Sequence, residues 1–296
     1  MGTYKNGNTI VMIQDDGTKI RYVPDNVVAQ PQYPESIDLK ICNRCEMNCA
    51  QCHECSTWDG KLGNLSSKLI DSLHPYTEVA IGGGDPFLHP NLPDFLQKLK
   101  KQEVIANITV HWLSFIKNIE TLRDWSDKGL IHGLGVSINE TVPEQVIKEL
   151  QNFSHAVVHT IVGIANNEVL NQLVDKNLNI LFLGYKYFGR GKKYSIRHRI
   201  SISSNTNWLA NNLPSYFERF RAVSFDNLAI KQVRLKNMLR PDVFDKIYMG
   251  DDGTFTMYVD LVENKYAVSS TSAERFDIDS NNIDDLFANI RKITCI

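Results

Sequence analysis

The feature that most constrains the fold is a regular alternation of short apolar runs with amphipathic segments, which begins at Ser36. Six runs predict strands: Ile37–Ile41, Glu78–Ile81, Ala106–Trp112, Gly133–Ile138, Val157–Val162 and Asn179–Tyr185. Five segments between them predict helices: Ser66–Leu73, Pro93–Lys101, Ile119–Lys128, Pro143–Asn152 and Asn167–Lys176. The strand runs are almost continuously apolar, which is typical of strands buried on both faces. We therefore predict an α/β fold with a parallel sheet and right-handed crossovers.

The segments on either side of this core follow other patterns. Thr9–Ile13 and Thr18–Val23 flank an Asp16-Gly17 turn and predict an N-terminal β-hairpin. Near the C-terminus the sequence predicts, in order, a helix, two strands of a hairpin and a last helix: Thr206–Phe220, Thr254–Leu261, Tyr266–Ser270 and Ile283–Ile293. Val223–Val233 is ambiguous. The expected organisation is a hairpin and connector over 1–35, a core over 36–200 and an α+β extension over 201–296.

Composition and charge exclude several classes of protein. The chain has 296 residues, with 32 Lys and Arg against 34 Asp and Glu, so no overall basic field favours a nucleic-acid partner. No run approaches the roughly 18 apolar residues of a membrane helix. Residues 1–10 are polar and lack the layout of a signal peptide. We expect a cytoplasmic protein without a membrane partner.

Five of the six cysteines fall within fourteen residues, directly after the first predicted core strand: Cys42, Cys45, Cys49, Cys52 and Cys55. An odd, crowded set in a long chain indicates metal ligation in a reducing compartment and not a disulfide framework. The gaps suit neither the two separated pairs of a structural zinc site nor the spacing of a bacterial ferredoxin. The spacing Cys45-x3-Cys49-x2-Cys52 suits a four-iron cluster with one open iron.

This three-cysteine motif resembles the signature of the radical S-adenosylmethionine (SAM) superfamily. The resemblance covers about residues 36–190 and implies a partial (β/α)6 TIM-like barrel. It implies that Cys45, Cys49 and Cys52 hold a single [4Fe-4S] cluster whose fourth iron binds SAM. One-electron reduction then cleaves SAM to a 5′-deoxyadenosyl radical, which abstracts hydrogen from a substrate. The family usually has an aromatic residue before the third cysteine, whereas this chain has Gln51.

The remaining cysteines are expected to have no part in the cluster. Cys42 and Cys55 lie beside the three ligands in sequence, and we expect both to be unligated. Cys295 stands alone near the C-terminus and is most simply a structural or incidental residue. The shortage of cysteines after position 55 predicts one cluster and no auxiliary cluster.

The resemblance also implies a set of residues that contact SAM. Gly82, Gly83, Gly84 and Asp85 follow the second strand and are similar to the Gly-Gly-Glu-Pro-like motif of the family, which receives the amino group of SAM. Ser137 and Asn139 end the fourth strand, and Gly163 and Ile164 follow the fifth. The alternative is a tight turn for the glycine loop and a polar strand end for Ser137 and Asn139, while the alternative for the nearby Asn166 is a helix N-cap. Glycines allow the close approach of backbone to a ligand.

Candidate catalytic residues adjoin the predicted cluster or end the sixth strand: His53, Glu54 and Lys186. A histidine or a carboxylate next to the site can donate a proton or contact the substrate. Lys186, with Arg190, is expected to hold an anionic group of SAM or substrate, and a solvated loop is the alternative. His111 and His159 lie within predicted strands, where a lone histidine is more often a hydrogen-bonded core residue.

The C-terminal extension, with its Asp-Gly hairpin and terminal helix, weakly resembles that of peptide-modifying radical SAM enzymes. A peptide is therefore the first expected substrate. The alternatives are a nucleoside or other small molecule, or the activation of a glycyl-radical enzyme. A one-electron reductant protein of the flavodoxin or ferredoxin type is the implied partner. A hypothesis of a different class is a non-catalytic interaction module that binds zinc through the cysteines.

Overall fold

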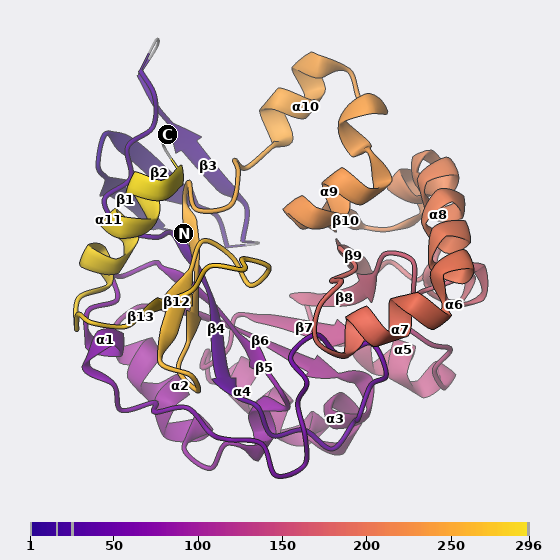
Figure 1. Ribbon diagram of the computed structural model, residues 1–296, viewed down its shortest axis with the longest axis horizontal. Helices are drawn as coiled ribbons and strands as arrows, with labels where there is room; N and C mark the ends of the chain where they lie inside the picture. The colour runs from indigo at the N-terminus through magenta and orange to yellow at the C-terminus, as the bar shows by residue number, and fades with distance from the viewer. Residues whose placement is uncertain (1, 16, 25–26, 295–296) are drawn as a thin grey trace.

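A ten-stranded sheet forms the body of the computed structural model, which describes residues 2–15, 17–24 and 27–294 (Figure 1). Asp16 of the predicted turn and Cys295 lie outside these ranges. In spatial order the strands are β10 (Ala222–Phe225), β9 (Asn179–Leu183), β8 (Ala156–Ile161), β7 (Gly133–Ser137), β6 (Ile105–His111), β5 (Glu78–Gly83), β4 (Ser36–Cys42), β11 (Thr256–Asp260), β12 (Lys265–Ala267) and β13 (Phe276–Asp277). Pairing is parallel from β10 to β11 and antiparallel from β11 to β13.

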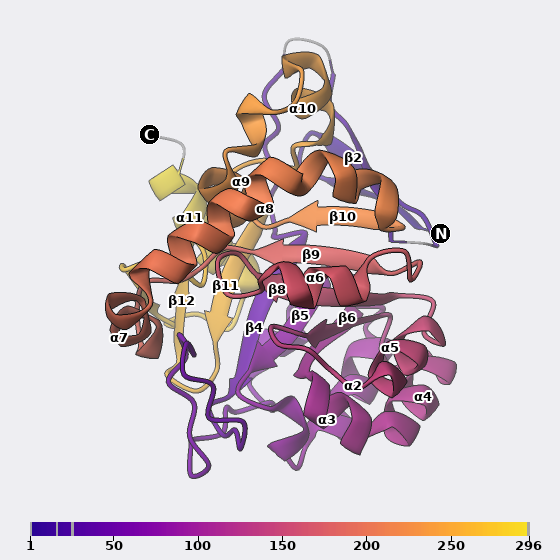
Figure 2. The same ribbon diagram turned by 90° about the vertical axis from the view of Figure 1, so that its right-hand side faces the viewer.

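Helices cover the outer face of the parallel strands, and a longer helical stretch follows β9 (Figure 2). Those among the core strands are α1 (Lys68–Asp71), α2 (Leu92–Lys101), α3 (Trp112–Lys117), α4 (Ile119–Asp127), α5 (Glu144–Gln151) and α6 (Asn167–Leu173), with the 3₁₀ turn η1 (Pro86–Leu88). Those after β9 are α7 (Arg190–Arg197), α8 (Arg199–Arg219), α9 (Asn227–Val233), the 3₁₀ turn η2 (Leu235–Asn237), α10 (Pro241–Ile247) and α11 (Ile283–Thr294).

The six predicted core strands are all present and pair in parallel in the predicted order, which confirms the α/β partial barrel. Their ends differ from the predicted ends by at most two residues. One difference has a clear local cause: Trp112 opens α3 and does not end β6, because the His111 side chain accepts a hydrogen bond from the Leu113 amide and caps the helix. The five predicted helices are also present.

The prediction that these strands are buried on both faces is wrong for the inner face. Along β6, residues alternate between buried and half-buried, and the buried ones pack under the helices. Asn107, Thr109 and His111 lie on the other, inner face of the same strand. The physical reason is that the sheet is open, so solvent reaches a lumen that a closed barrel fills with side chains.

The C-terminal extension contributes strands to both sides of the core sheet. The ambiguous segment Val223–Val233 forms β10, which pairs with β9, and then α9. At the other side β11 pairs with β4, and the predicted hairpin of β11 and β12 is present. β10 and β13 are the two edges of the sheet, so among the described strands no pairing joins β10 to the side formed by β11, β12 and β13; this boundary is called the seam.

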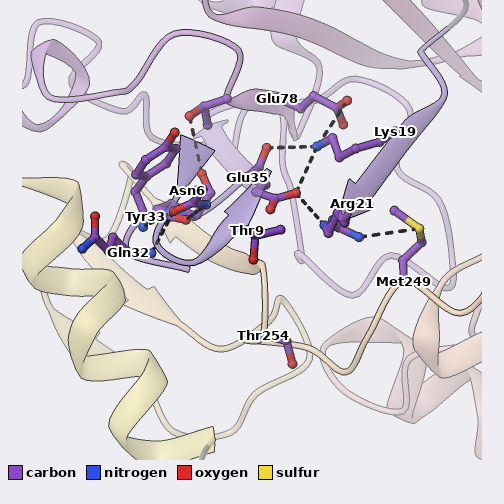
Figure 3. A network of polar contacts seen from close by, with 12 residues as sticks. Asn6, Thr9, Lys19, Arg21, Gln32, Tyr33, Glu35, Glu78, Met249 and Thr254 are labelled. Atoms are coloured by element: carbon purple, nitrogen blue, oxygen red, sulfur yellow. Dashed lines mark hydrogen bonds and ion pairs between the residues drawn. The ribbon is translucent and has the colours of Figure 1, made fainter. Parts of the chain in front are cut away.

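A separate three-stranded sheet of β1 (Gly2–Asn6), β2 (Thr9–Ile13) and β3 (Lys19–Tyr22) lies near the N-terminal ends of β4 and β5. It contains the predicted hairpin and one additional strand, β1. Figure 3 shows its attachment: the buried Glu35 carboxylate lies 2.8 Å from Arg21 Nε and 3.8 Å from Lys19 Nζ. Lys19 also pairs with Glu78 at the start of β5.

None of the helices that the structure describes is both long and apolar enough to cross a lipid bilayer.

Candidate iron–sulfur and cofactor site

The predicted site residues come together at one edge of the sheet, where the parallel strands end. The cysteine loop follows β4, and the glycine loop overlaps the end of β5. Ser137 is the last residue of β7, Gly163 follows β8, and Lys186 follows β9. This edge is where active sites of parallel α/β barrels are built, because it collects one loop from each strand.

The cysteine loop is held in shape by the chain segment that returns after it. Cys45 N donates to Thr57 O at 2.8 Å, and Asn43 N donates to Lys61 O at the same distance. The Cys52 amide donates to the Cys49 carbonyl at 3.2 Å, which forms a tight turn. Cys45, Cys49 and Cys52 are thus carried on one compact loop and are all partly exposed.

Cys42 differs from these three cysteines in its environment. Its side chain is fully buried, and its Sγ lies 3.2 Å from the Asp85 carbonyl oxygen. Burial raises the pKa of the Cys42 thiol to about 12. The Cys42 thiol therefore donates a hydrogen bond within the core. Cys55 is exposed and has a positive φ of 52°.

Cationic groups accompany the three partly exposed cysteines. Burial raises the pKa of Cys45 and Cys49, and the Arg190 guanidinium acts in the opposite direction on both. The Nε atoms of Arg190 and Arg44 are buried and have no hydrogen-bond partner among the described residues. An anionic cluster with three thiolates fits this loop, because it would be balanced by cations whose donors are unused.

A single metal ion fits the same residues less well. Among the described residues, no three His, Cys, Asp or Glu side chains gather closely enough to hold one ion. The thiolate ligands of an iron–sulfur cluster bind different iron atoms, so they do not need to converge on one point. The arrangement weighs against zinc at the cysteines.

Two glycines of the glycine loop pack closely against backbone atoms, and one faces open space. A Cβ on Gly83 would lie 2.3 Å from the Cys42 carbonyl oxygen, and one on Gly84 would lie 2.2 Å from the Arg44 carbonyl oxygen. A Cβ on Gly82 would meet nothing within 4 Å. Gly82 therefore leaves room for a ligand, while its two neighbours let β5 approach the cysteine loop.

Asp85 does not point its carboxylate freely into the site. Its Oδ1 accepts a hydrogen bond from the Phe87 amide at 3.1 Å and caps the turn η1. Its amide donates to the Arg44 carbonyl at 2.8 Å, so the residue fastens the glycine loop to the cysteine loop.

Three of the four remaining predicted contacts have structural partners of their own. Asn139 Oδ1 accepts from the Ile161 amide at 2.7 Å, which joins the ends of β7 and β8. Gly163, with a φ of +82°, packs on α8, where a Cβ would lie 2.8 Å from Ile202 Cγ2. The Ile164 amide donates to Ile161 O. Ser137 is half-buried at the end of β7, next in register to His159.

The three candidate catalytic residues form one connected polar group. His53 Nε2 lies 3.2 Å from Glu54 Oε1 and 3.1 Å from Lys186 Nζ. Burial lowers the pKa of His53, although its hydrogen bond to Glu54 acts to raise that pKa. Burial alone would raise the pKa of Glu54, but His53 and Lys40 outweigh it and hold that pKa well below its usual range. A carboxylate, a neutral imidazole and an ammonium group therefore stand side by side.

Sequence reasoning missed the other half of this network. Lys40 on β4 lies 2.7 Å from Glu54 Oε2 and 3.2 Å from Asp260 Oδ2 on β11. Burial lowers the pKa of Lys40, but the two carboxylates outweigh it and raise that pKa. Arg275 Nη1 approaches Asp260 at 3.6 Å, and Lys186 Nζ also donates to Ser270 Oγ at 2.9 Å. The sequence signal for this part of the network was Lys40, a lysine within the largely apolar predicted strand Ile37–Ile41.

The lumen below this network is also polar. Asp38 on β4 is reached by solvent, yet the surrounding barrel wall raises its carboxyl pKa, and Asp226 and Asp252 raise it further. Lys186 acts in the opposite direction. His159 lies over Gly135, and burial lowers its pKa to about 4, so it is a neutral lumen residue.

Comparisons with known proteins agree with this geometry. Residues 40–161 match the family model of a 4Fe-4S single cluster domain. No curated protein matches the chain in sequence. Among solved structures, the chain resembles Streptococcus suis SuiB bound to the precursor peptide SuiA, with a TM-score of 0.57 and 12% identity over 88% of this chain and 67% of that chain.

Two further solved structures share the fold. SuiB bound to S-adenosylmethionine gives a TM-score of 0.56 and 12% identity over 87% of this chain and 66% of that chain. Hexahistidine-tagged anSMEcpe with bound AdoMet gives a TM-score of 0.53 and 13% identity over 86% and 76%. The chain thus spans about two thirds of SuiB. Residues 40–161 thus match a 4Fe-4S single cluster domain, and the chain shares the partial-barrel fold of these SAM-bound structures.

Proposed function

We propose that this protein binds one [4Fe-4S] cluster through Cys45, Cys49 and Cys52 and uses it to cleave SAM reductively. The observation that carries the proposal is the separation of the cysteines: three lie partly exposed on one loop beside Arg190, while Cys42 is buried as a thiol. When bound, the cluster and SAM supply a 5′-deoxyadenosyl radical that abstracts hydrogen from the substrate.

The chain's own residues bind and orient the cofactor and keep the lumen polar. Gly82 leaves open space at the end of β5, next in register to Lys40. The backbone around Gly82, Gly83, Gly84 and Asp85 would receive the amino group of SAM there. Ser137 would contact SAM from the end of β7. Asn139, Gly163 and Ile164 would support the same pocket through backbone, since their side-chain and amide bonds are already in use.

The polar group of His53, Glu54 and Lys186 would position the substrate above the lumen. It presents a carboxylate and an ammonium group on either side of a neutral imidazole, with His53 Nε2 at 3.2 Å from Glu54 and 3.1 Å from Lys186. Lys40 and Asp260 fix the group from the opposite side by ion pairs. The network therefore holds its charges in place without the substrate.

We propose a peptide as the substrate. SuiB, which shares the fold, has been solved with a precursor peptide bound. The sheet has two free edges, at β10 and β13, so no strand pairing closes the barrel around the lumen.

The test is anaerobic reconstitution with iron and sulfide, followed by SAM and dithionite. We expect a brown protein with about four irons per chain and release of 5′-deoxyadenosine. Replacing Cys45, Cys49 or Cys52 with Ala should abolish the visible absorbance and the release. Cys42→Ala and Cys55→Ala are the matched controls and should retain iron.

Three results would contradict the proposal. Loss of iron in either control variant would overturn the choice of ligands. A colourless protein with one zinc per chain, or an intact cluster that releases no 5′-deoxyadenosine with SAM, reductant and candidate peptides, would favour the non-catalytic metal-binding module.

A further inference from the structure

The segment that follows α6 is strongly cationic. From residue 176 to residue 217 the chain carries seven Lys and Arg residues and no Asp or Glu, although the whole protein has a formal net charge of -2. Four of these cations, here named the α7 patch, are exposed on α7 and at the start of α8: Lys192, Lys193, Arg197 and Arg199. Within the described part of the chain, none of the four forms an ion pair, whereas the flanking Lys176 and Arg219 pair with Glu144 and Asp175.

The α7 patch adjoins the loop that would hold the cluster. The Arg190 amide at the start of α7 donates to the Cys52 carbonyl oxygen at 3.0 Å. Gly189, just before it, lies so close that a Cβ there would be 2.2 Å from the His53 carbonyl oxygen. Figure 2 shows α7 at the end of the molecule that carries this loop. Lys192, the first residue of the α7 patch, therefore lies two residues after Arg190, whose amide contacts the backbone of the proposed ligand Cys52.

Two apolar side chains lie among these cations. Ile196 is 74% exposed and Ile200 is 87% exposed, and they are four residues apart across the junction of α7 and α8. A small apolar contact surrounded by charges of one sign fits a transient complex with a partner of opposite charge. The charge of the patch selects an acidic partner.

The cysteine count indicates what this acidic partner does. After Cys55 the sequence contains only Cys295, so no second cluster can relay an electron through the protein. Electron tunnelling falls steeply with distance, so a donor has to approach the cysteine loop itself. The unpaired cations adjoin this loop.

We propose that the α7 patch is the docking surface for an acidic one-electron donor protein. The inference rests on the proposed function. In the docked complex the donor's prosthetic group is oxidised by one electron, which passes to the cluster, and no proton or leaving group is transferred. The cations raise the encounter rate by electrostatic steering, and the two isoleucines supply the contact.

The test uses the reconstituted full-length protein and a flavodoxin as the probe, because flavodoxin is an acidic one-electron donor. The variants are Lys192→Glu with Lys193→Glu, and Arg197→Glu with Arg199→Glu. The matched control is Lys5→Glu with Lys101→Glu, which makes the same charge change at exposed positions on β1 and α2. Circular dichroism and thermal unfolding confirm that each variant folds.

Two quantities are measured at low and at high salt: the affinity for flavodoxin by calorimetry, and the rate at which photoreduced flavodoxin bleaches the cluster absorbance. We expect both patch variants to lose about tenfold in affinity and in rate at low salt, with the difference disappearing at high salt. The control should keep unmodified behaviour. Dithionite, which needs no docking surface, should reduce all variants equally.

Each other outcome is decisive. Unchanged affinity and rate in the patch variants would overturn the inference. A hollow of about 520 Å³ beside the patch is lined by residues including Tyr187, Ile196 and Arg199. An equal loss of the reduction rate with flavodoxin and with dithionite would show that the patch acts on the cluster loop itself and would overturn the docking role. Failure of the unmodified protein to release 5′-deoxyadenosine with SAM, dithionite and candidate peptides would refute the proposed function, while the affinities still test docking.

Discussion

Gly→Ala substitutions in the glycine loop at the end of β5 can distinguish an effect on SAM binding from an effect on the stability of the fold. Gly83 has a φ of +112°, and a Cβ there would lie 2.3 Å from the Cys42 carbonyl oxygen. Gly84 would bring a Cβ to 2.2 Å from the Arg44 carbonyl oxygen. Both obstacles are backbone atoms of the strand and loop that carry the cysteines, so they cannot move independently of the site.

We expect Gly83→Ala to cost about 3 kcal/mol, because an unfavourable φ costs about 1–3 kcal/mol and the backbone overlap adds to it. For a chain of this length that corresponds to a fall in Tm of roughly 5 °C. Gly84→Ala should cost about 2–3 kcal/mol, since its overlap is similar but its φ is not strained. Gly82→Ala should change stability by no more than about 0.5 kcal/mol, because its Cβ meets nothing within 4 Å.

The effect on SAM should be the reverse of the effect on stability. The methyl group of Gly82→Ala enters the space proposed for SAM, and overpacking of about 1.4 kcal/mol or more corresponds to at least about tenfold weaker binding. The assay is anaerobic equilibrium titration of SAM into reconstituted protein, together with thermal unfolding of the protein without SAM. The reasoning fails if Gly82→Ala binds SAM as tightly as the unmodified protein, or if it is destabilised as much as Gly83→Ala.

Three further predictions concern other parts of the molecule. Burial lowers the pKa of His159 to about 4 in the fold, against about 6.5 in the unfolded chain. Lowering the pH from 6.5 to 4 should therefore reduce the free energy of unfolding by up to about 3 kcal/mol. Urea titrations of His159→Gln should lack this pH dependence. Gly189→Ala should lose about 2–4 kcal/mol and part of its reconstituted iron, because its Cβ would strike the His53 carbonyl; full iron content would contradict this. Glu35→Ala should cost about 3 kcal/mol in chemical denaturation, because it leaves Arg21 without a carboxylate partner and Lys19 with Glu78 alone; a loss below about 1 kcal/mol would refute the role of Glu35.

The parts of the fold that were predictable are those with a local signal. Each of the six core strands and five helices carries its own periodicity, and each predicted site residue follows a strand end, so topology brings them to one edge. β1 and β10 were missed because they are short and alternate between exposed and half-buried residues without a strong apolar run.

The half of the site that sequence did not predict depends on long-range pairing. Lys40 and Asp260 are 220 positions apart, and only the parallel pairing of β11 with β4 sets them opposite each other. No local pattern encodes that register. Asp85 was predicted from its motif, but its use as a cap for η1 depends on a turn whose geometry only the structure shows.

The seam between β10 and the side formed by β11, β12 and β13 affects how the wall of the barrel can widen. Widening a closed barrel breaks a ladder of backbone hydrogen bonds, whereas this wall can part where no ladder exists. Side-chain bonds span the gap: Asn227 Nδ2 to Asp252 Oδ1 at 2.7 Å, and Lys186 Nζ to Ser270 Oγ at 2.9 Å. Each contributes on the order of 1 kcal/mol. Opening the wall there would break side-chain hydrogen bonds and no strand pairing, and one of those bonds is made by Lys186, a residue of the proposed site.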